Sequence, residues 1–135
     1  MKLQPDKSDT PTVSGYGPGW IAVDGERFSH SLVISSTGQR FDWNCGSFAA
    51  LTPQHFARIS EIDAELVLFG SGEKLRRPPP AWLVPLLARR VGLETMDTRA
   101  ACRTYNILAG EGRKVVAAFL LDELRAAADC RVNCS

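Results

Sequence analysis

Two short polar segments carry the residue types and spacing best suited to chemistry in this chain. Gly70-Ser71-Gly72 follows the apolar run 65–69, and Asp97-Thr98-Arg99 follows the short run 93–96. If both runs are parallel strands, the two loops lie at one sheet edge, where α/β proteins commonly bind ligands. The candidate ligand-binding residues are therefore the six that follow these strands: Gly70, Ser71, Gly72, Asp97, Thr98 and Arg99.

The chemistry that this edge offers is the binding of a small ligand. Free backbone N–H groups at a helix start near residue 98 attract anions, and Lys74, Arg76 or Arg77 could assist. Asp97 opposes a phosphate, because like charges repel. The alternative is that the glycines only form a turn and Asp97 only caps a helix. A dinucleotide site fits poorly, because the third glycine of that fingerprint is missing and three prolines precede the next helix.

The cysteines and histidines do not form a recognisable catalytic or metal-binding set. Cys102 lies one turn into a predicted helix, whose N-terminus lowers a thiol pKa, but nothing places His30 or His55 beside it. Small apolar packing is the simpler interpretation. Cys130 and Cys134 have the spacing of metal ligands on a helix but lack the further ligands that zinc requires. We predict no catalytic residue, no metal site and no cofactor.

Composition excludes several functional classes. The chain has 135 residues, 44% hydrophobic and 23% charged, with a formal charge of +1, whereas proteins that bind nucleic acid carry a basic excess. No apolar run reaches the roughly 18 residues of a membrane span, so membrane insertion is not expected. The N-terminus resembles neither a secretory signal nor a transit peptide. We expect a cytoplasmic protein with reduced thiols.

Hydrophobic periodicity predicts the elements that position the two polar segments. The first part is predicted as a β-meander, with strands in 20–23, 28–34 and 41–43. A short helix follows Thr52-Pro53, and strand 65–69, helix 82–91 and strand 93–96 form a βαβ unit with parallel strands. A further helix begins at Asp97-Thr98, and 115–121 is a central strand covered on both faces. The result is one α/β domain with a mixed sheet.

The segment from Met96 to Leu108 is the most recognisable part of the chain. With the Gly-Ser-Gly loop, the proline-led helix and Glu111-Gly112-Arg113, it resembles the small α/β family that includes mitochondrial complex I assembly factor 3 and many uncharacterised bacterial and archaeal proteins. The resemblance covers roughly residues 15 to 121. We expect a bacterial member, with residues 1–15 as a flexible arm, 16–121 as the domain and 122–135 as a polar tail.

The resemblance implies a three-layer fold around a mixed central sheet in which one strand is antiparallel to its neighbours. It also implies that the mitochondrial members assist complex I assembly by protein contact, and it supplies no catalytic residue to carry over.

Three functional hypotheses follow from the sequence. The first is a non-catalytic protein-binding module that assists assembly of a respiratory, complex I-like or other complex, with a protein as its partner. The second is a small-molecule-binding protein or uncharacterised enzyme that uses the cleft at 70–72 and 97–99. The third is homo-oligomerisation through a sheet edge in the meander. Trp20, Trp43 and Trp82 are either interface anchors or core residues, and we expect at least two to be core.

Overall fold

Eight strands and a few short helices make up the computed structural model, which describes residues 10–121. A three-stranded sheet contains β1 (Val13–Gly17), β2 (Trp20–Val23) and β3 (Glu26–Phe28). A five-stranded sheet has the order β5-β4-β8-β6-β7, with β4 (Leu32–Ser35), β5 (Arg40–Asp42), β6 (Leu66–Gly70), β7 (Gly92–Met96) and β8 (Val115–Phe119). The helices are α2 (Pro53–Ile59), α3 (Val84–Ala88) and α4 (Thr98–Gly110), with 3-10 turns η1 (Phe48–Ala50) and η2 (Pro80–Leu83).

The larger sheet is mixed, as predicted. β6 runs parallel to β7 and to β8, whereas β4 is antiparallel to both of its neighbours, β5 and β8. Gly70 at the end of β6 lies opposite Met96 at the end of β7. The parallel pair that brings the two polar segments to one edge is therefore confirmed.

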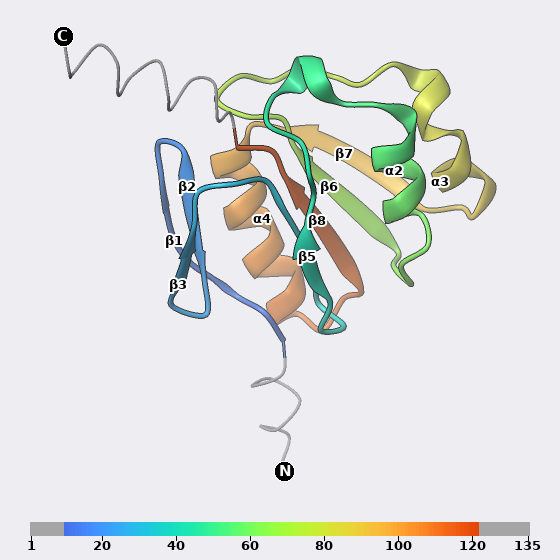
Figure 1. The fold of residues 1–135 in the computed structure, drawn as a ribbon. Helices are drawn as coiled ribbons and strands as arrows, with labels where there is room; N and C mark the ends of the chain where they lie inside the picture. Colours follow the sequence, from blue (N-terminus) through green and yellow to red (C-terminus); the bar gives the residue numbers. More distant parts are fainter. Residues whose placement is uncertain (1–9, 122–135) are drawn as a thin grey trace, which may run out of the picture.

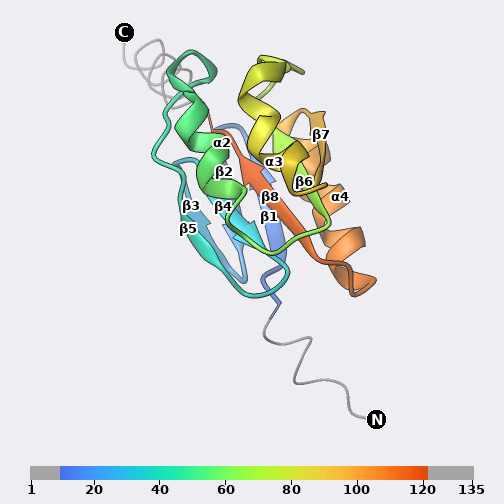
Figure 2. The ribbon, with the colours of Figure 1, turned by 90° about the vertical axis from the view of Figure 1, so that its right-hand side faces the viewer.

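The fold has three layers, and this sheet is the middle one. Helices α2 and α3 cover one face, and α4 with the three-stranded sheet covers the other (Figure 1; Figure 2). The central strand β8 is buried along its whole length, because each of its faces contributes to a core. Val116 and Ala118 face the α2–α3 core, while Ala117 and Phe119 face the α4 core. The three-layer α/β fold is confirmed.

The predicted meander is divided between the two sheets. The run 28–34 is not one strand, because β3 ends at Phe28 and β4 begins at Leu32. Between them, buried Ser31 turns inward: its hydroxyl accepts a hydrogen bond from Leu121 N at 2.9 Å, and its carbonyl accepts one from Trp43 N at 3.1 Å. These long-range bonds break the local alternation on which the prediction rested.

The proline-led helix is shorter than the predicted 82–91. A 3-10 turn comes first, and Pro85 then lies in the first turn of α3, where a proline costs no helical hydrogen bond. The helix ends at Ala88, and Arg90 adopts a positive φ of 59°. Gly92 consequently begins β7 and does not close the helix.

The boundary predicted after residue 15 also shifts, because β1 begins at Val13. The side chain of Asn106 holds this strand: its oxygen accepts from Val13 N at 2.9 Å, and its amide donates to Val13 O at 2.8 Å. Tyr105 donates to Pro11 O at 2.7 Å, so contacts with α4 reach back to residue 11. The remainder of the predicted arm, the 122–135 tail and Cys130 and Cys134 lie outside the described residues.

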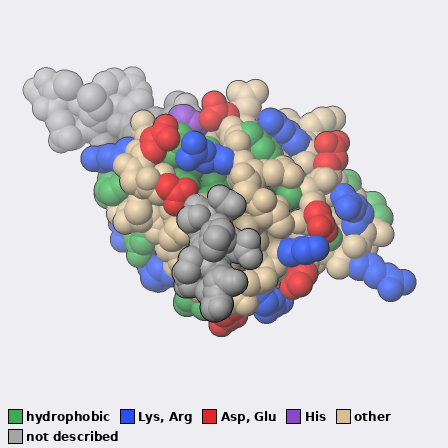
Figure 3. Space-filling model, turned by 90° about the horizontal axis from the view of Figure 1, so that it is seen from below, with side chains coloured by type: hydrophobic (Ala, Val, Ile, Leu, Met, Phe, Trp, Pro, Cys, Tyr) green, Lys and Arg blue, Asp and Glu red, His purple; other side chains and the backbone are tan. Residues whose placement is uncertain are grey.

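The face of the molecule shown in Figure 3 mixes charges of both signs. Seen from below, acidic and basic side chains are interspersed and hydrophobic ones form only small groups (Figure 3). Across residues 10–121, no helix is both long and apolar enough to cross a membrane.

Candidate functional site

The loops after β6 and β7 lie side by side at the carboxyl edge of the parallel strands. Ser71 N donates to Met96 O at 2.8 Å, and Thr98 N donates to Gly72 O at 2.8 Å. The six candidate residues are therefore brought to one place. Their polar groups, however, are used mainly to join these loops to each other.

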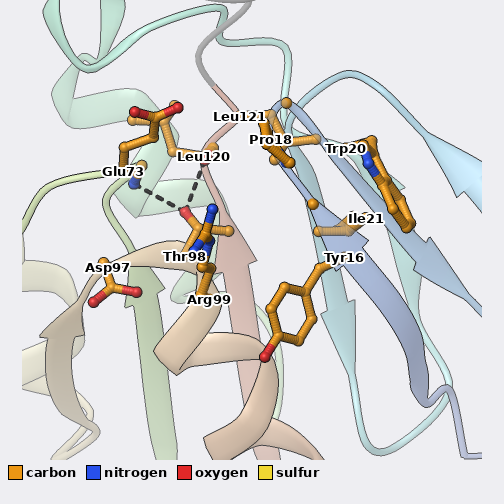
Figure 4. A pocket seen from close by; sticks show the side chains of 13 residues that line it. Tyr16, Pro18, Trp20, Ile21, Glu73, Asp97, Thr98, Arg99, Leu120 and Leu121 are labelled. Carbon is orange, nitrogen blue, oxygen red and sulfur yellow. Dashed lines mark hydrogen bonds between the residues drawn. The ribbon is translucent and has the colours of Figure 1, made fainter.

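The hydroxyl of Thr98 joins three separate segments of the chain. It accepts a hydrogen bond from Gly72 N at 2.9 Å and donates one to Leu120 O at 2.9 Å (Figure 4). Leu120 N in turn donates to Gly70 O at 2.9 Å. Because Thr98 is buried, these backbone groups depend on its hydroxyl for partners. The Thr98 hydroxyl therefore links the ends of β6 and β8 to the start of α4.

Gly70 is required by the close approach of α4 to β6. A Cβ at this position would lie 3.0 Å from Thr98 Cα and 3.1 Å from Ala101 Cβ, which is closer than carbon atoms normally pack. A side chain here would push the helix away from the strand. The first glycine of the loop thus serves packing.

Ser71 has a similarly structural environment. Its side chain is buried, with Oγ 2.6 Å from Lys74 O and 3.2 Å from Met96 O, and it accepts from Arg76 N at 3.0 Å. The hydroxyl therefore shapes the loop that follows β6. It has no exposed face from which to attack a substrate.

The helix start near residue 98 does not offer the free donors expected of an anion site. Asp97 is the N-cap of α4, and its carboxylate accepts from Ala100 N at 2.9 Å. Thr98 N is already bonded to Gly72 O. Two of these donors are occupied and a carboxylate lies beside them, which disfavours an anion at this helix start. Asp97 is explained by capping, which stabilises a helix by about 0.5–2 kcal/mol.

A cavity of about 530 Å³ lies beside this edge. One wall is the hairpin of β1 and β2, and the other is formed by the two strand-end loops and the residues after β8 (Figure 4). Of the six candidates, Gly72, Asp97, Thr98 and Arg99 line it, while Gly70 and Ser71 do not. The other lining residues are Tyr16, Gly17, Pro18, Gly19, Trp20, Ile21, Glu73, Leu120 and Leu121.

The hairpin wall of the cavity was missed by sequence reasoning. Tyr16 and Pro18 face Thr98 and Arg99 across the cavity (Figure 4), and Arg103 donates to the Tyr16 hydroxyl at 3.0 Å. The only local signal was the glycine- and proline-rich turn at 17–19, which predicts a hairpin but not where it packs.

Cys102 is a core residue and not a nucleophile. It is fully buried, and burial raises the pKa of its thiol from 9.0 to about 12, although Arg103 opposes the shift. The two histidines are engaged elsewhere, His30 with Asp42 at 2.7 Å and His55 in the capping box of α2. Small apolar packing explains Cys102.

We expect Cys102 to resist alkylation in the folded protein. A pKa of about 12 lowers the thiolate fraction on the order of a thousandfold relative to a thiol at pKa 9.0. The measurement is peptide-resolved mass spectrometry after iodoacetamide treatment at pH 8.5, with and without denaturant. A native alkylation rate within tenfold of the denatured rate would contradict the assignment.

The same raised pKa predicts how stability depends on pH. The folded-state pKa of Cys102 lies above its unfolded value. The stability that depends on keeping this thiol protonated is therefore complete below pH 9 and is lost as pH rises from about 9 to 12. Burial also raises the pKa of Tyr105, so its contribution has the same sign. Denaturant titrations at pH 8 and pH 10 should show the lower stability at pH 10.

Within residues 10–121, no group of three or more metal-ligating side chains comes together. Every fully buried side-chain nitrogen or oxygen in this part of the chain has a hydrogen-bond partner. No unpaired buried polar group therefore points into the cavity.

Comparison with known proteins gives consistent matches over almost the whole described region. A family model, "Protein of unknown function (DUF498/DUF598)", matches residues 13–120. The chain is also 34% identical over 112 residues to the NADH dehydrogenase (ubiquinone) 1 alpha subcomplex assembly factor 3 of Bos taurus. That alignment covers 80% of this chain but only 59% of the bovine protein, so the chain spans about three fifths of this relative.

Solved structures show the same fold. The crystal structure of a Bordetella parapertussis protein is 40% identical and superposes with a TM-score of 0.79, covering 84% of this chain and 97% of that one. The solution structure of a Bordetella pertussis protein, described as an Mth938-like domain, is 36% identical with a TM-score of 0.74, covering 90% and 93%.

Proposed function

Because this chain belongs to the DUF498/DUF598 family, we propose that it is a non-catalytic protein-binding module that assists assembly of a protein complex. Similarity to a complex I assembly factor supports this role, and a respiratory, complex I-like assembly is the first client to examine. The partner we propose is a protein.

The observation that carries the proposal is the exposed apolar face of α3. Leu86 points into the core at 1% exposure, as expected for the inner face of a surface helix. Val84 and Leu87, however, are 57% and 66% exposed, where charged or polar side chains are usual. Contiguous exposed apolar side chains commonly mark a protein interface, whereas single exposed ones are ordinary. We call Val84 and Leu87 the α3 patch.

The strand-end edge supports the non-catalytic part of the proposal. Its hydroxyls and its carboxylate are committed to holding Gly72, Leu120 and the first turn of α4. Before these groups could transfer a proton or attack a substrate, they would have to release hydrogen bonds that join β6, β8 and α4.

Replacing both patch residues with serine should reduce recovery of a specific partner about tenfold or more, because burying a valine or leucine side chain contributes about 1.5–3 kcal/mol and a tenfold change needs only about 1.4 kcal/mol. The measurement is quantitative co-purification from the native host with the V84S/L87S protein and the wild type. Leu75→Ser is the matched control, since Leu75 is 51% exposed but lies outside α3. Equal recovery with the double variant, or recovery of general chaperones alone, would contradict the proposal.

A small-molecule site in the cavity is the second candidate, because about 530 Å³ falls within the usual 300–1,000 Å³ of ligand pockets. A bound metabolite would raise the melting temperature through linkage. Arg99→Ala should abolish that shift, while Arg113→Ala, which removes an exposed arginine outside the cavity, should not. If a broad metabolite screen leaves the melting temperature unchanged, this candidate is rejected.

A further inference from the structure

The outer edge of β7 carries backbone groups that no neighbouring strand uses. β7 is the last strand of the five-stranded sheet. Gly92 N donates to Glu65 O, and Met96 O accepts from Ser71 N, so the even-numbered residues of β7 turn their amide groups toward β6. In a ladder, alternate residues point the opposite way, which directs the N–H and C=O groups of Leu93 and Thr95 outward.

These outward groups remain unpaired in the part of the chain that the structure describes. No hydrogen bond outside the β6–β7 ladder uses a main-chain atom of Leu93 or Thr95. Both residues are half-buried, and Glu94 between them is exposed. An edge of this kind is a template for another strand.

The side chains around this edge differ between the two faces of the sheet. On the face covered by α3, Leu93 packs partly against the core. The exposed α3 patch belongs to the helix that packs on β7 (Figure 2). On the opposite face, Glu94 presents a carboxylate, while Met96 packs partly against the α4 core. An added strand would therefore run beside Leu93 and Thr95 on one face of the sheet and beside a negative charge on the other.

Charge decides between a second copy of this chain and a different protein. An antiparallel pair of β7 strands that used all outward groups would pair Leu93 with Thr95 of the other copy. It would then place Glu94 directly opposite Glu94, and like charges in that position are destabilising. A heterologous strand with a cation at that position is favoured instead.

We propose that the β7 edge is the docking site for an extended segment of a protein partner, which adds a sixth strand to the sheet. The segment places apolar side chains beside Leu93 and the α3 patch, and a lysine or arginine opposite Glu94. Main-chain hydrogen bonds to Leu93 and Thr95 supply affinity, and the alternating side chains supply specificity. This inference rests on the proposed protein-binding role and names its surface and the chemistry of its ligand.

The test uses random 12-residue peptides displayed on phage and selected against the immobilised full chain. Enriched peptides should alternate apolar residues with lysine or arginine. Thr95→Pro removes an outward N–H, a change that an edge strand tolerates, and Glu94→Lys reverses the charge at an exposed position. Each should weaken peptide binding about tenfold or more, while Glu61→Lys, the same charge change on the loop after α2, should not. The amides of Leu93 and Thr95 should become protected from hydrogen exchange when the peptide binds.

Peptides that bind the Thr95→Pro and Glu94→Lys proteins as well as the wild type would overturn the inference, as would failure to enrich any peptide. Concentration-dependent dimerisation through β7, measured by sedimentation and abolished by Thr95→Pro, would also overturn it in favour of a second copy. A host partner that is lost from the V84S/L87S protein but retained by both β7 variants would refute this inference alone. If the wild type recovers no specific partner, the proposed function itself fails.

Discussion

Replacing Thr98 with valine is expected to lower the free energy of unfolding by about 2–4 kcal/mol. Valine keeps the shape of the side chain but removes the hydroxyl that pairs with Gly72 N and Leu120 O. Each buried backbone group left without a partner costs about 1–3 kcal/mol. The lost hydrogen bonds lie where β6, β8 and α4 meet. We therefore expect the whole five-stranded sheet to become less stable.

Urea unfolding followed by circular dichroism measures this effect. Thr98→Ser is the matched control, because serine keeps the hydroxyl and should lose roughly 1 kcal/mol or less, the value of about one buried methyl group. Equal losses of unfolding free energy for the valine and serine variants would show that the Thr98 hydroxyl does not stabilise this junction.

Replacing Trp43 with alanine should cost about 3–5 kcal/mol, the range for removal of a buried large aromatic side chain. Trp43 is 1% exposed, and its ring meets Phe56 and Phe69 edge-on at centroid distances of 5.7 and 5.8 Å. Its indole N–H also donates to His55 O at 3.2 Å. The substitution therefore opens a cavity at the centre of the α2–α3 core.

Trp20→Ala provides the comparison for Trp43. Trp20 is only half-buried, and Arg27 stacks on its ring at 3.9 Å, an interaction worth about 0.5–1 kcal/mol at an exposed site. Thermal or urea unfolding should show a loss for Trp20→Ala that is less than half the loss for Trp43→Ala. Similar losses would contradict the distinction between a core and a surface tryptophan.

Local sequence features were sufficient to predict the strand-end edge. The apolar run before Gly70, the glycine loop and the capping residue Asp97 are short-range signals, and the right-handed crossover rule supplied the parallel pairing. These signals correctly predicted that the loops after β6 and β7 meet. They did not reveal what the residues do there. A Gly-Ser-Gly loop and an Asp-Thr helix start occur both in ligand-binding sites and where they only form a turn and cap a helix.

The features that were missed depend on contacts between distant parts of the chain. Asn106 bonds to Val13 across 93 positions, and Ser31 bonds to Leu121 across 90. Hydrophobic periodicity contains no information about such pairs. The separate hairpin sheet, the second wall of the cavity and the early start of β1 all follow from contacts of this kind.

The exposed apolar residues were hidden for a different reason. Leu83, Leu86 and Leu87 share one helical stripe in the sequence, which predicts that all face the core. In the five-residue α3, Leu86 faces the core at 1% exposure, while its neighbour Leu87 is 66% exposed. Only the structure separates the inner leucine from the outer one.

Site-specific photocrosslinking in living cells of the native host tests the central claim most directly. A photoreactive amino acid replaces Leu87 in the α3 patch in one protein and Arg99 at the cavity in another. We expect the probe at position 87 to form an adduct with a specific protein, and the probe at position 99 to form none. Protein adducts from position 99 alone, or from neither position, would contradict a protein-binding module that acts through α3 and β7.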